Sequence, residues 1–349
     1  MRVATSGIGL LLLGGSIGVS AQEPDVHKIP ALPRAIAGQC VGRVGDALVV
    51  AGGSTWSAPP WDGGVKSWQS SVYVLHSPNG AWERAENLSG AMAYGASAQW
   101  GDALLCVGGQ NATRTFDTVL RFRVRDGKIV RDELPRLPEA LTNAGAAVVD
   151  GTLYVVGGQR DLTPMSASKD IWSLKLERGA IWERSNTPPW PHARILPVVA
   201  GCSGTLYVIS GADLRPDAKG ASVRTYLQDA WTRSASGLWK RLPELPAAVV
   251  AAPSACDANG RIQIFGGDDG KLANQILALR DNHPGFSRKV LTYDASRQEW
   301  TSVLELPLSL VTTAVALWHG NYVIAGGESH PGHRSAEVVA LTFQGPRRR

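Results

Sequence analysis

The sequence is poor in cysteine, with four in 349 residues, and it has neither a CxxC pair nor a cysteine spacing typical of a metal site. We therefore predict no bound metal. All four cysteines lie in apolar runs with the pattern of strands, so we expect buried free thiols at Cys40, Cys106, Cys202 and Cys256. A disulfide between Cys202 and Cys256, in neighbouring stretches of the chain, stays open as an alternative.

A strong charge of one sign is also missing. The formal net charge is +5, and no basic stripe interleaved with aromatic residues occurs. The sequence therefore gives no reason to expect a nucleic-acid partner. The residues 346–349 form a short basic tail, which we interpret as a frayed terminus.

The apolar run Ile8–Val19 is too short for a comfortable membrane span. Arg2 precedes it, and the small residues Val19-Ser20-Ala21 follow it. A positive start, a short apolar centre and small residues at the exit are typical of a secretory signal peptide. We predict such a peptide over residues 1–21, and a periplasmic or secreted protein, unattached to a membrane, whose main domain covers residues 22–345.

Glycine and proline, in contrast, are plentiful, with 39 and 21 residues, and 44% of the chain is hydrophobic. This composition is typical of an ordered protein that is rich in turns. Six apolar runs each end in two small residues, and they recur about every fifty residues. The six pairs are Gly52-Gly53, Gly108-Gly109, Gly157-Gly158, Ser210-Gly211, Gly266-Gly267 and Gly326-Gly327.

Each pair is preceded by another apolar run and followed by a polar loop and an alternating strand. In four copies a strand with tryptophan follows, at Trp82, Trp182, Trp239 and Trp300. One unit of four short antiparallel strands cannot bury both of its faces, so the units must stack radially. The sequence thus predicts an all-β, six-bladed kelch-type β-propeller. The last copy lacks its fourth strand, and we expect Val26–Pro33 to supply it in a 3+1 closure.

In such a blade the loop after the second strand and the loop before the first strand open at the same end of the ring. We expect a set of polar residues from these loops to bind substrate there, and cations near a few acids suit an anionic, hydroxyl-rich ligand. The candidates are Arg34, Tyr94, Gln110, Asn143, Gln159, Arg160, Arg194, Asp268 and Arg288. Two alternatives stay open: Arg34 and Arg194 would only bridge neighbouring blades, and Asp268 would only shape a turn.

The last copy, IAGGESHPGHRSAEV at Ile324–Val338, differs from the others. A carboxylate, Glu328, follows its glycines at once, and Arg334 comes after a Pro-Gly bend. We infer that the six recurring pairs determine the fold and that the two charged residues peculiar to the last copy carry the function.

Three stretches resemble a known family. GGESHPGHRSAEV resembles the GE-x-x-PG-x-R-[ST] segment of N-acetylneuraminate epimerases, which are kelch-type sialic acid mutarotases. The stretch Met92–Gln110 is similar to their R-A-Y-G-x-S segment, and Phe286–Trp300 to the strand ahead of their GE blade. Here the GE blade is last rather than central, an order that resembles the cyclically permuted branch of these mutarotases.

The resemblance implies anomer interconversion of N-acetylneuraminate or a related acidic sugar, without metal or redox cofactor. It assigns the catalytic acid/base to Glu328 and the active-site arginine to Arg334. One position departs from the family pattern, because Met92 stands where the family has an arginine ahead of Ala-Tyr-Gly.

Other functions stay open beside this one. A non-enzymatic kelch module that binds carbohydrate or protein would use Glu328 and Arg334 only as a salt bridge that fixes a loop. A sialidase would need S-x-D-x-G-x-T-W boxes, and the sequence has none. A copper oxidase would need paired histidine and tyrosine ligands and a Cys–Tyr cofactor, and none of the four cysteines has such a setting.

Overall fold

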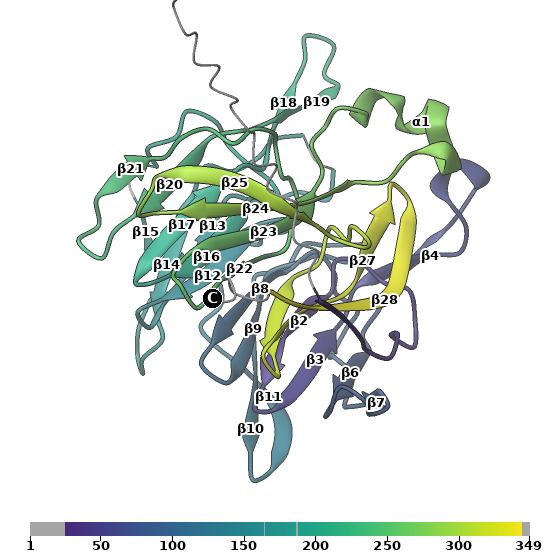
Figure 1. Cartoon of the computed structure of the whole chain (residues 1–349), viewed down its shortest axis with the longest axis vertical. Coiled ribbons are helices and arrows are strands. Elements are labelled where there is room, and N and C mark those ends of the chain that lie inside the picture. Colours follow the sequence, from purple (N-terminus) through teal and green to yellow (C-terminus); the bar gives the residue numbers. More distant parts are fainter. Residues whose placement is uncertain (1–24, 164, 186–187, 344–349) are drawn as a thin grey trace, which may run out of the picture.

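The computed structural model describes residues 25–163, 165–185 and 188–343. The predicted signal peptide and the basic tail at 346–349 lie outside these residues. The described part contains six four-stranded antiparallel sheets and two two-stranded hairpins. The sequence prediction of a six-bladed, all-β propeller is confirmed (Figure 1).

We number the sheets as blades in chain order, each from its innermost strand outward. Blade 1 holds β2 (Cys40–Val44), β3 (Ala47–Ala51), β6 (Val72–Leu75) and β7 (Glu83–Arg84). Blade 2 holds β8 (Ala96–Trp100), β9 (Ala103–Val107), β10 (Val119–Arg125) and β11 (Lys128–Glu133). Blade 3 holds β12 (Gly145–Val149), β13 (Thr152–Val156), β14 (Ile171–Lys175) and β15 (Glu183–Arg184).

Blade 4 holds β16 (Val198–Cys202), β17 (Thr205–Ile209), β20 (Ala230–Arg233) and β21 (Trp239–Arg241). Blade 5 holds β22 (Ser254–Cys256), β23 (Ile262–Gly267), β24 (Ser287–Asp294) and β25 (Glu299–Glu305). Blade 6 holds β26 (Val315–Trp318), β27 (Asn321–His330), β28 (His333–Thr342) and, from the other end of the chain, β1 (Asp25–Lys28).

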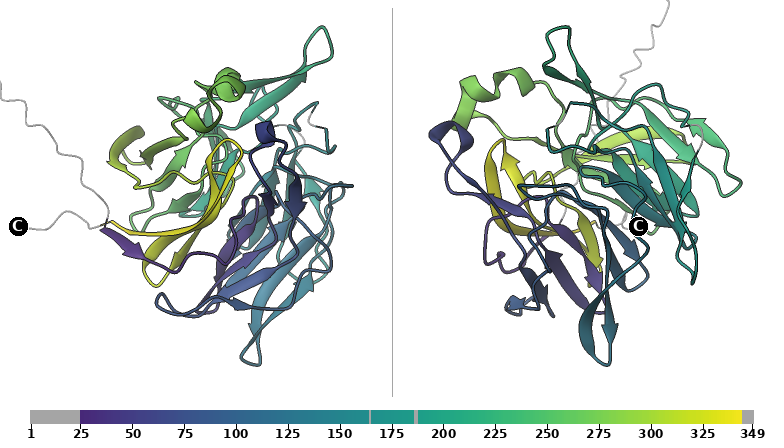
Figure 2. Two further views of the ribbon diagram at one scale, coloured as in Figure 1. Left: turned by 90° about the vertical axis from the view of Figure 1, so that its right-hand side faces the viewer. Right: turned by 180° about the vertical axis from the view of Figure 1, so that it is seen from behind.

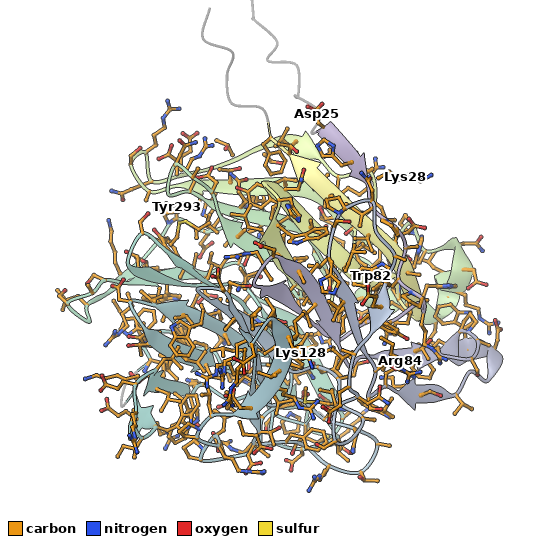
Figure 3. The ribbon with its side chains drawn as sticks, turned by 90° about the horizontal axis from the view of Figure 1, so that it is seen from below. Asp25, Lys28, Trp82, Arg84, Lys128 and Tyr293 are labelled. Atoms are coloured by element: carbon orange, nitrogen blue, oxygen red, sulfur yellow. A yellow bond between two sulfur atoms is a disulfide. The ribbon has the colours of Figure 1, made fainter. Side chains whose placement is uncertain are left out.

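The strand β1 closes the ring by pairing antiparallel with β28, from Asp25 opposite Thr342 to Lys28 opposite Val339. Figure 3 shows the strand between the labelled Asp25 and Lys28 at the edge of blade 6. The 3+1 closure is therefore confirmed. The predicted strand Val26–Pro33 was too long, because pairing ends at Lys28 and the following prolines cannot donate to a ladder.

Apolar side chains fill each gap between neighbouring blades. Separate clusters of buried aliphatic and aromatic residues join blades 6 and 1, 1 and 2, 2 and 3, 3 and 4, 4 and 5, and 5 and 6. The tryptophan strands add polar contacts between blades. Trp82 Nε1 donates to the carbonyl of Pro30 and Trp182 Nε1 to that of Pro135, both at 2.9 Å. The Leu-Pro exit of one blade thus accepts a hydrogen bond from the next.

The paired glycines are explained by the close approach of the next blade. Gly53 N–H donates to the Met92 carbonyl at 2.8 Å, and a Cβ on Gly52 would lie 2.3 Å from that same oxygen. Gly52 also has a φ of +71°, which favours glycine. A side chain at this position would therefore push the two blades apart.

The cysteines form two disulfides, and the expectation of free thiols is wrong. Cys40 is bonded to Cys106 and Cys202 to Cys256, with Cα atoms 5.9 and 5.2 Å apart. Each bond joins strands of neighbouring blades, blades 1 and 2 in one case and blades 4 and 5 in the other. Apolar strands that pack face to face bring their cysteines within bonding reach.

Three insertions extend from the same end of the ring. The first is the hairpin of β4 (Ser54–Trp56) and β5 (Lys66–Trp68), with a short turn of 3₁₀ helix at Pro60–Asp62. The second is the hairpin of β18 (Ala212–Pro216) and β19 (Ser222–Tyr226), and the third contains the helix α1 (Ile276–Leu279) between 3₁₀ turns at Ala273–Gln275 and Arg280–Asn282. Figure 2 shows them on the upper side of the molecule, opposite the β10–β11 hairpin.

Candidate active site

Six residues that precede the innermost strands form a closed ring of backbone hydrogen bonds around the axis. Each N–H donates to the carbonyl of the ring residue one blade earlier, at 2.6 to 3.1 Å. All six have a positive φ, which is strained for residues other than glycine and persists where the surroundings fix it. The members are Gly38, Tyr94, Asn143, Leu196, Ala251 and Thr312.

This ring forms one end of the central channel. The channel has a volume of about 400 Å³ and is lined by the innermost strands of all six blades, where alanine, valine and glycine predominate. All six ring residues line it, whereas Glu328 and Arg334 do not. The candidate catalytic pair therefore lies outside the channel.

The loops that follow the paired small residues meet the loops that precede the innermost strands. In every blade, an isolated antiparallel bridge joins the two loops next to the ring. We call this end of the propeller the mouth. The bridges are Ala37 to Ser54, Ala93 to Gln110, Thr142 to Gln159, Ile195 to Ala212, Val250 to Asp268 and Val311 to Glu328. Glu328 is thus placed at the mouth, as the sequence predicts.

Glu328 and Arg334 face each other across the hairpin of β27 and β28. Arg334 Nη1 lies 2.7 Å from Glu328 Oε2, and the side chains are 6% and 18% exposed. The Gly332 N–H donates to Glu328 Oε1 at 2.7 Å. Burial alone would lower the pKa of Arg334, but the charge of Glu328 and the hydrogen bonds within the pair and to Tyr94 raise it above its usual value. The pair is therefore a carboxylate held next to a permanent cation.

The hydroxyl of Tyr94 joins this pair to the first insertion. Arg334 Nη2 and Lys66 Nζ each donate to it at 2.9 Å, and Ser54 Oγ lies 2.9 Å away. Ser54 is fully buried. We call these five residues, Ser54, Lys66, Tyr94, Glu328 and Arg334, the Tyr94 cluster. It brings together side chains from β4, β5, the ring and blade 6.

Arg334 keeps one donor atom that nothing in the described chain satisfies. Its Nε is buried and makes no hydrogen bond within the described residues, whereas Nη1 lies 2.7 Å from Glu328 Oε2. Leaving a buried charged donor unpaired costs about 1–3 kcal/mol or more. Such donors at a mouth favour a ligand with acceptor oxygens.

Of the other predicted substrate residues, only Tyr94 contacts this pair directly. Asn143 is a ring residue that lines the channel. Gln110 and Gln159 lie at the mouth, and each has a buried Oε1 without a partner among the described residues. Their place is consistent with ligand binding, but they lie on blades 2 and 3 rather than on blade 6.

The side chain of Arg194, which the sequence predicted to bind substrate, is engaged in contacts within the propeller. Its side chain is fully buried, with Nη2 at 2.8 Å from Asp229 Oδ2 and Nη1 donating to the Ser210 carbonyl at 2.9 Å. The guanidinium also lies over the Trp190 ring at 4.8 Å. Its backbone N–H donates to the Ser168 carbonyl of blade 3 at 3.0 Å while its side chain contacts blade 4, so the alternative of a bridge between blades fits this residue.

Two further predicted cations, Arg160 and Arg288, are paired with other carboxylates. Arg160 pairs with Glu139 and, at 2.8 Å, with Asp170, and the hydrogen bond that Arg160 donates to Glu139 raises the pKa of the arginine. Arg288 lies at the start of β24 and pairs with Glu305 of the outer strand at 3.3 Å. Both arginines are thus paired with carboxylates other than Glu328.

Arg34 is exposed and makes no ion pair within the described chain. Asp268 accepts a hydrogen bond from the Gly270 N–H at 3.0 Å, as turn residues do, and another from the Tyr226 hydroxyl at 2.8 Å. Burial, with the charge of Asp268 behind it, raises the pKa of Tyr226 to about 12. For Asp268, the turn role that the sequence left open fits this geometry.

Lys66 was not among the residues predicted from the sequence. Its segment does not belong to the repeated pattern of the blades. The tryptophans Trp56 and Trp68 on the paired strands β4 and β5 were the one sequence feature that could have indicated a binding position for a cation. Met92, in contrast, is buried at 6% exposure in the cluster between blades 1 and 2. The family arginine at that position therefore has no equivalent charge here.

No group of three or more His, Cys, Asp or Glu side chains in the described residues could hold a metal ion. Within the same residues, no helix is long and apolar enough to cross a membrane.

Comparisons with known proteins agree with the motifs. The Kelch motif family matches residues 140–184, which cover blade 3. The N-acetylneuraminate epimerase of Haemophilus influenzae (strain 86-028NP) is 27% identical over 228 residues, 58% of this chain and 58% of that protein. The protein of the same name from Escherichia coli O1:K1 is 32% identical over 111 residues, 28% of this chain and 29% of that protein. The matched stretches thus span less than two thirds of these curated relatives.

The solved structure of YjhT has the same fold. It superposes with a TM-score of 0.68 at 16% identity, over 92% of this chain and 98% of that one. This structure supports the fold, and the curated relatives confirm the resemblance to N-acetylneuraminate epimerases.

Proposed function

We propose that the protein is a mutarotase, an isomerase that interconverts the anomers of N-acetylneuraminate or a closely related acidic sugar. The relatives named N-acetylneuraminate epimerase support the substrate class. The observation that carries the proposal is the mouth pair: a partly exposed Glu328 carboxylate beside a buried Arg334 whose Nε has no partner among the described residues. Both residues stand at charged positions of the family motif that the chain resembles.

The reaction opens and recloses a cyclic hemiketal. A base removes the proton of the anomeric hydroxyl while an acid protonates the ring oxygen, and the ring C–O bond breaks to give an open ketone. Rotation about the adjacent C–C bond and reclosure on the other face give the opposite anomer. Atoms and electrons balance within the sugar and one proton carrier, so no redox partner is consumed.

Glu328 serves as the proton carrier in this proposal. The Gly332 N–H holds Oε1, and Arg334 holds Oε2 from the other side, so the carboxylate has a fixed direction. A positioned acid or base contributes about 10²–10⁴-fold to such a reaction, which already proceeds slowly in water. Arg334 would orient Glu328 and offer its free Nε–H to an oxygen of the sugar.

A binding module without catalysis is the second candidate, because the same contacts also describe a salt bridge that fixes the hairpin. The variant Glu328→Gln separates the two. It keeps the shape of the side chain and can still accept from Gly332, but it cannot carry the proton. Glu305→Gln is the matched control, since Glu305 lies on the outer strand of blade 5 and pairs with the exposed Arg288 of β24.

The assay is anomer exchange of N-acetylneuraminate followed by NMR, with sugar binding followed by calorimetry. We expect Glu328→Gln to reduce the catalysed exchange about 10²-fold or more while binding survives, and Glu305→Gln to change neither. An unchanged exchange rate in Glu328→Gln would refute the catalytic assignment. A sialoside should not be hydrolysed. Export to the periplasm or medium remains a prediction from the N-terminal sequence.

A further inference from the structure

The Tyr94 cluster has an unbalanced charge. It contains two cations, Lys66 and Arg334, and one carboxylate, Glu328. The charge of Arg334 is compensated by Glu328 at 2.7 Å. Lys66 has no carboxylate within ion-pair distance among the described residues, so the cluster as a whole carries one excess positive charge.

Lys66 is held in place without an acidic partner. Its ammonium nitrogen lies 5.1 Å from the ring centre of Trp56, 5.3 Å from that of Trp68 and 4.9 Å from that of Tyr94. Trp68 and Tyr94 support each other edge to face at 5.7 Å. Aromatic faces stabilise a cation electrostatically while leaving its charge unpaired.

The ammonium also keeps donors to spare. Of its three N–H groups, one donates to the Tyr94 hydroxyl at 2.9 Å, and no other hydrogen bond from Lys66 occurs in the described chain. Arg334 Nη2 lies 2.9 Å from the same hydroxyl, so the two cations flank one oxygen. The two nitrogens therefore lie within about 6 Å of each other, close enough for the two cations to bind one anionic group.

We propose that Lys66 is the residue that selects an acidic sugar, by binding the sugar's carboxylate. The inference rests on the proposed function for the identity of the ligand. Arg334 alone would not attract an anion strongly, because its charge is already matched by Glu328. The uncompensated ammonium of Lys66 supplies the attraction. The three aromatic rings hold this ammonium next to the Tyr94 hydroxyl.

The rings also explain why this position suits lysine. The β4–β5 pairing sets Trp56 opposite Lys66 and Trp68 opposite Ser54. The hairpin thus delivers the cation and two of its three aromatic neighbours as one unit. A loop of this kind can change the charge preference of the mouth without altering the blades.

The test compares N-acetylneuraminate with its methyl ester, which lacks the negative charge. Binding of both is measured by calorimetry on the wild type, Lys66→Met, Lys66→Arg and, as a control, the exposed Lys169→Met. We expect the wild type and the control to prefer the acid by about tenfold or more, as for a hydrogen bond between charged groups. Lys66→Met should abolish the preference by weakening acid binding only, and Lys66→Arg should restore part of it.

Two outcomes would overturn the inference. If Lys66→Met keeps the preference for the acid, another group binds the carboxylate. If it weakens the acid and the ester equally, Lys66 only supports the fold of the hairpin, and equal melting temperatures of the four proteins exclude global unfolding as the cause. Because binding is measured and not turnover, the inference survives if the wild type selects the acid but does not catalyse exchange. In that case only the proposed function fails.

Discussion

Replacing Tyr94 by phenylalanine tests whether the cluster is as tightly connected as its distances indicate. The substitution removes one hydroxyl and keeps the ring, so the edge contact with Trp68 and the face under Lys66 are retained. It also leaves unchanged the circle of backbone hydrogen bonds around the axis, in which Tyr94 has a φ of +60°. Only three polar contacts are lost, those to Ser54, Lys66 and Arg334.

The expected loss of stability is dominated by Arg334. Its side chain is 6% exposed, so water cannot easily replace the lost acceptor of Nη2. A hydrogen bond to a charged group contributes about 1.5–3 kcal/mol, and leaving the donor buried and unpaired costs about as much. Lys66 is half-buried and can be hydrated, and Ser54 Oγ lies 3.4 Å from the Ala37 carbonyl, to which it can donate. We therefore expect Tyr94→Phe to lower the free energy of unfolding by about 2–3 kcal/mol.

Tyr154→Phe is the matched control. The Tyr154 hydroxyl accepts from Arg233 Nη1 at 3.1 Å, and both residues are partly exposed, so solvent can replace the contact. It should cost no more than about 0.5 kcal/mol. The measurement is urea unfolding of the oxidised proteins, compared through their midpoints at equal slope. Equal losses in the two variants would refute the idea that Tyr94 joins a buried charged network.

Three further changes test other parts of the structure. Gly332→Ala should lower the melting temperature more than Gly151→Ala. Both glycines have a φ above +70°, but a Cβ at Gly332 would lie 2.7 Å from a proline ring, whereas one at Gly151 would meet nothing within 4 Å. Replacing Cys202 and Cys256 by alanine should cost about 4 kcal/mol in urea unfolding, from the loop of 54 residues that the bond closes, and mass spectrometry of the wild type should find no free thiol at these positions. Burial raises the pKa of Asp229, but the charge of Arg194 and the hydrogen bonds to that arginine lower the pKa by more. The net shift of the Asp229 pKa is therefore downward. Its stabilising contribution is then present above the unfolded pKa of about 4 and is lost as pH falls through the folded value, so stability should fall more steeply in acid for the wild type than for Asp229→Asn.

The blade architecture could be predicted from sequence because its signal is local and repeated. A residue without a side chain, such as Gly52, is needed at the end of a strand where the backbone of the next blade comes within hydrogen-bond distance. The same close approach recurs from blade to blade, so the glycines recur in the sequence. Closure of the propeller by the N-terminal segment could be predicted because the last repeat lacks its fourth strand. The placement of Glu328 at the mouth followed from the same repeat, since its loop corresponds to that of Ser54.

The rest depends on contacts that a single sequence does not reveal. Arg194 stands beside a strand start like a ligand residue, and only the later position of Asp229 shows it to be a bridge. Cysteines in apolar strands have the same pattern whether free or bonded, so the bond of Cys40 was not foreseen. Lys66 reaches Tyr94 only because the β4–β5 hairpin folds over the mouth, and its loop carries no repeated pattern.

The central claim is that an acidic sugar binds at the mouth, between Lys66 and Glu328, and not in the apolar channel on the other side of the backbone ring. A crystal structure of Glu328→Gln soaked with N-acetylneuraminate tests this directly. We expect the carboxylate of the sugar within hydrogen-bond distance of Lys66 and Arg334, with the anomeric carbon beside residue 328. Sugar bound in the channel, or on the outer faces of the blades, would contradict it.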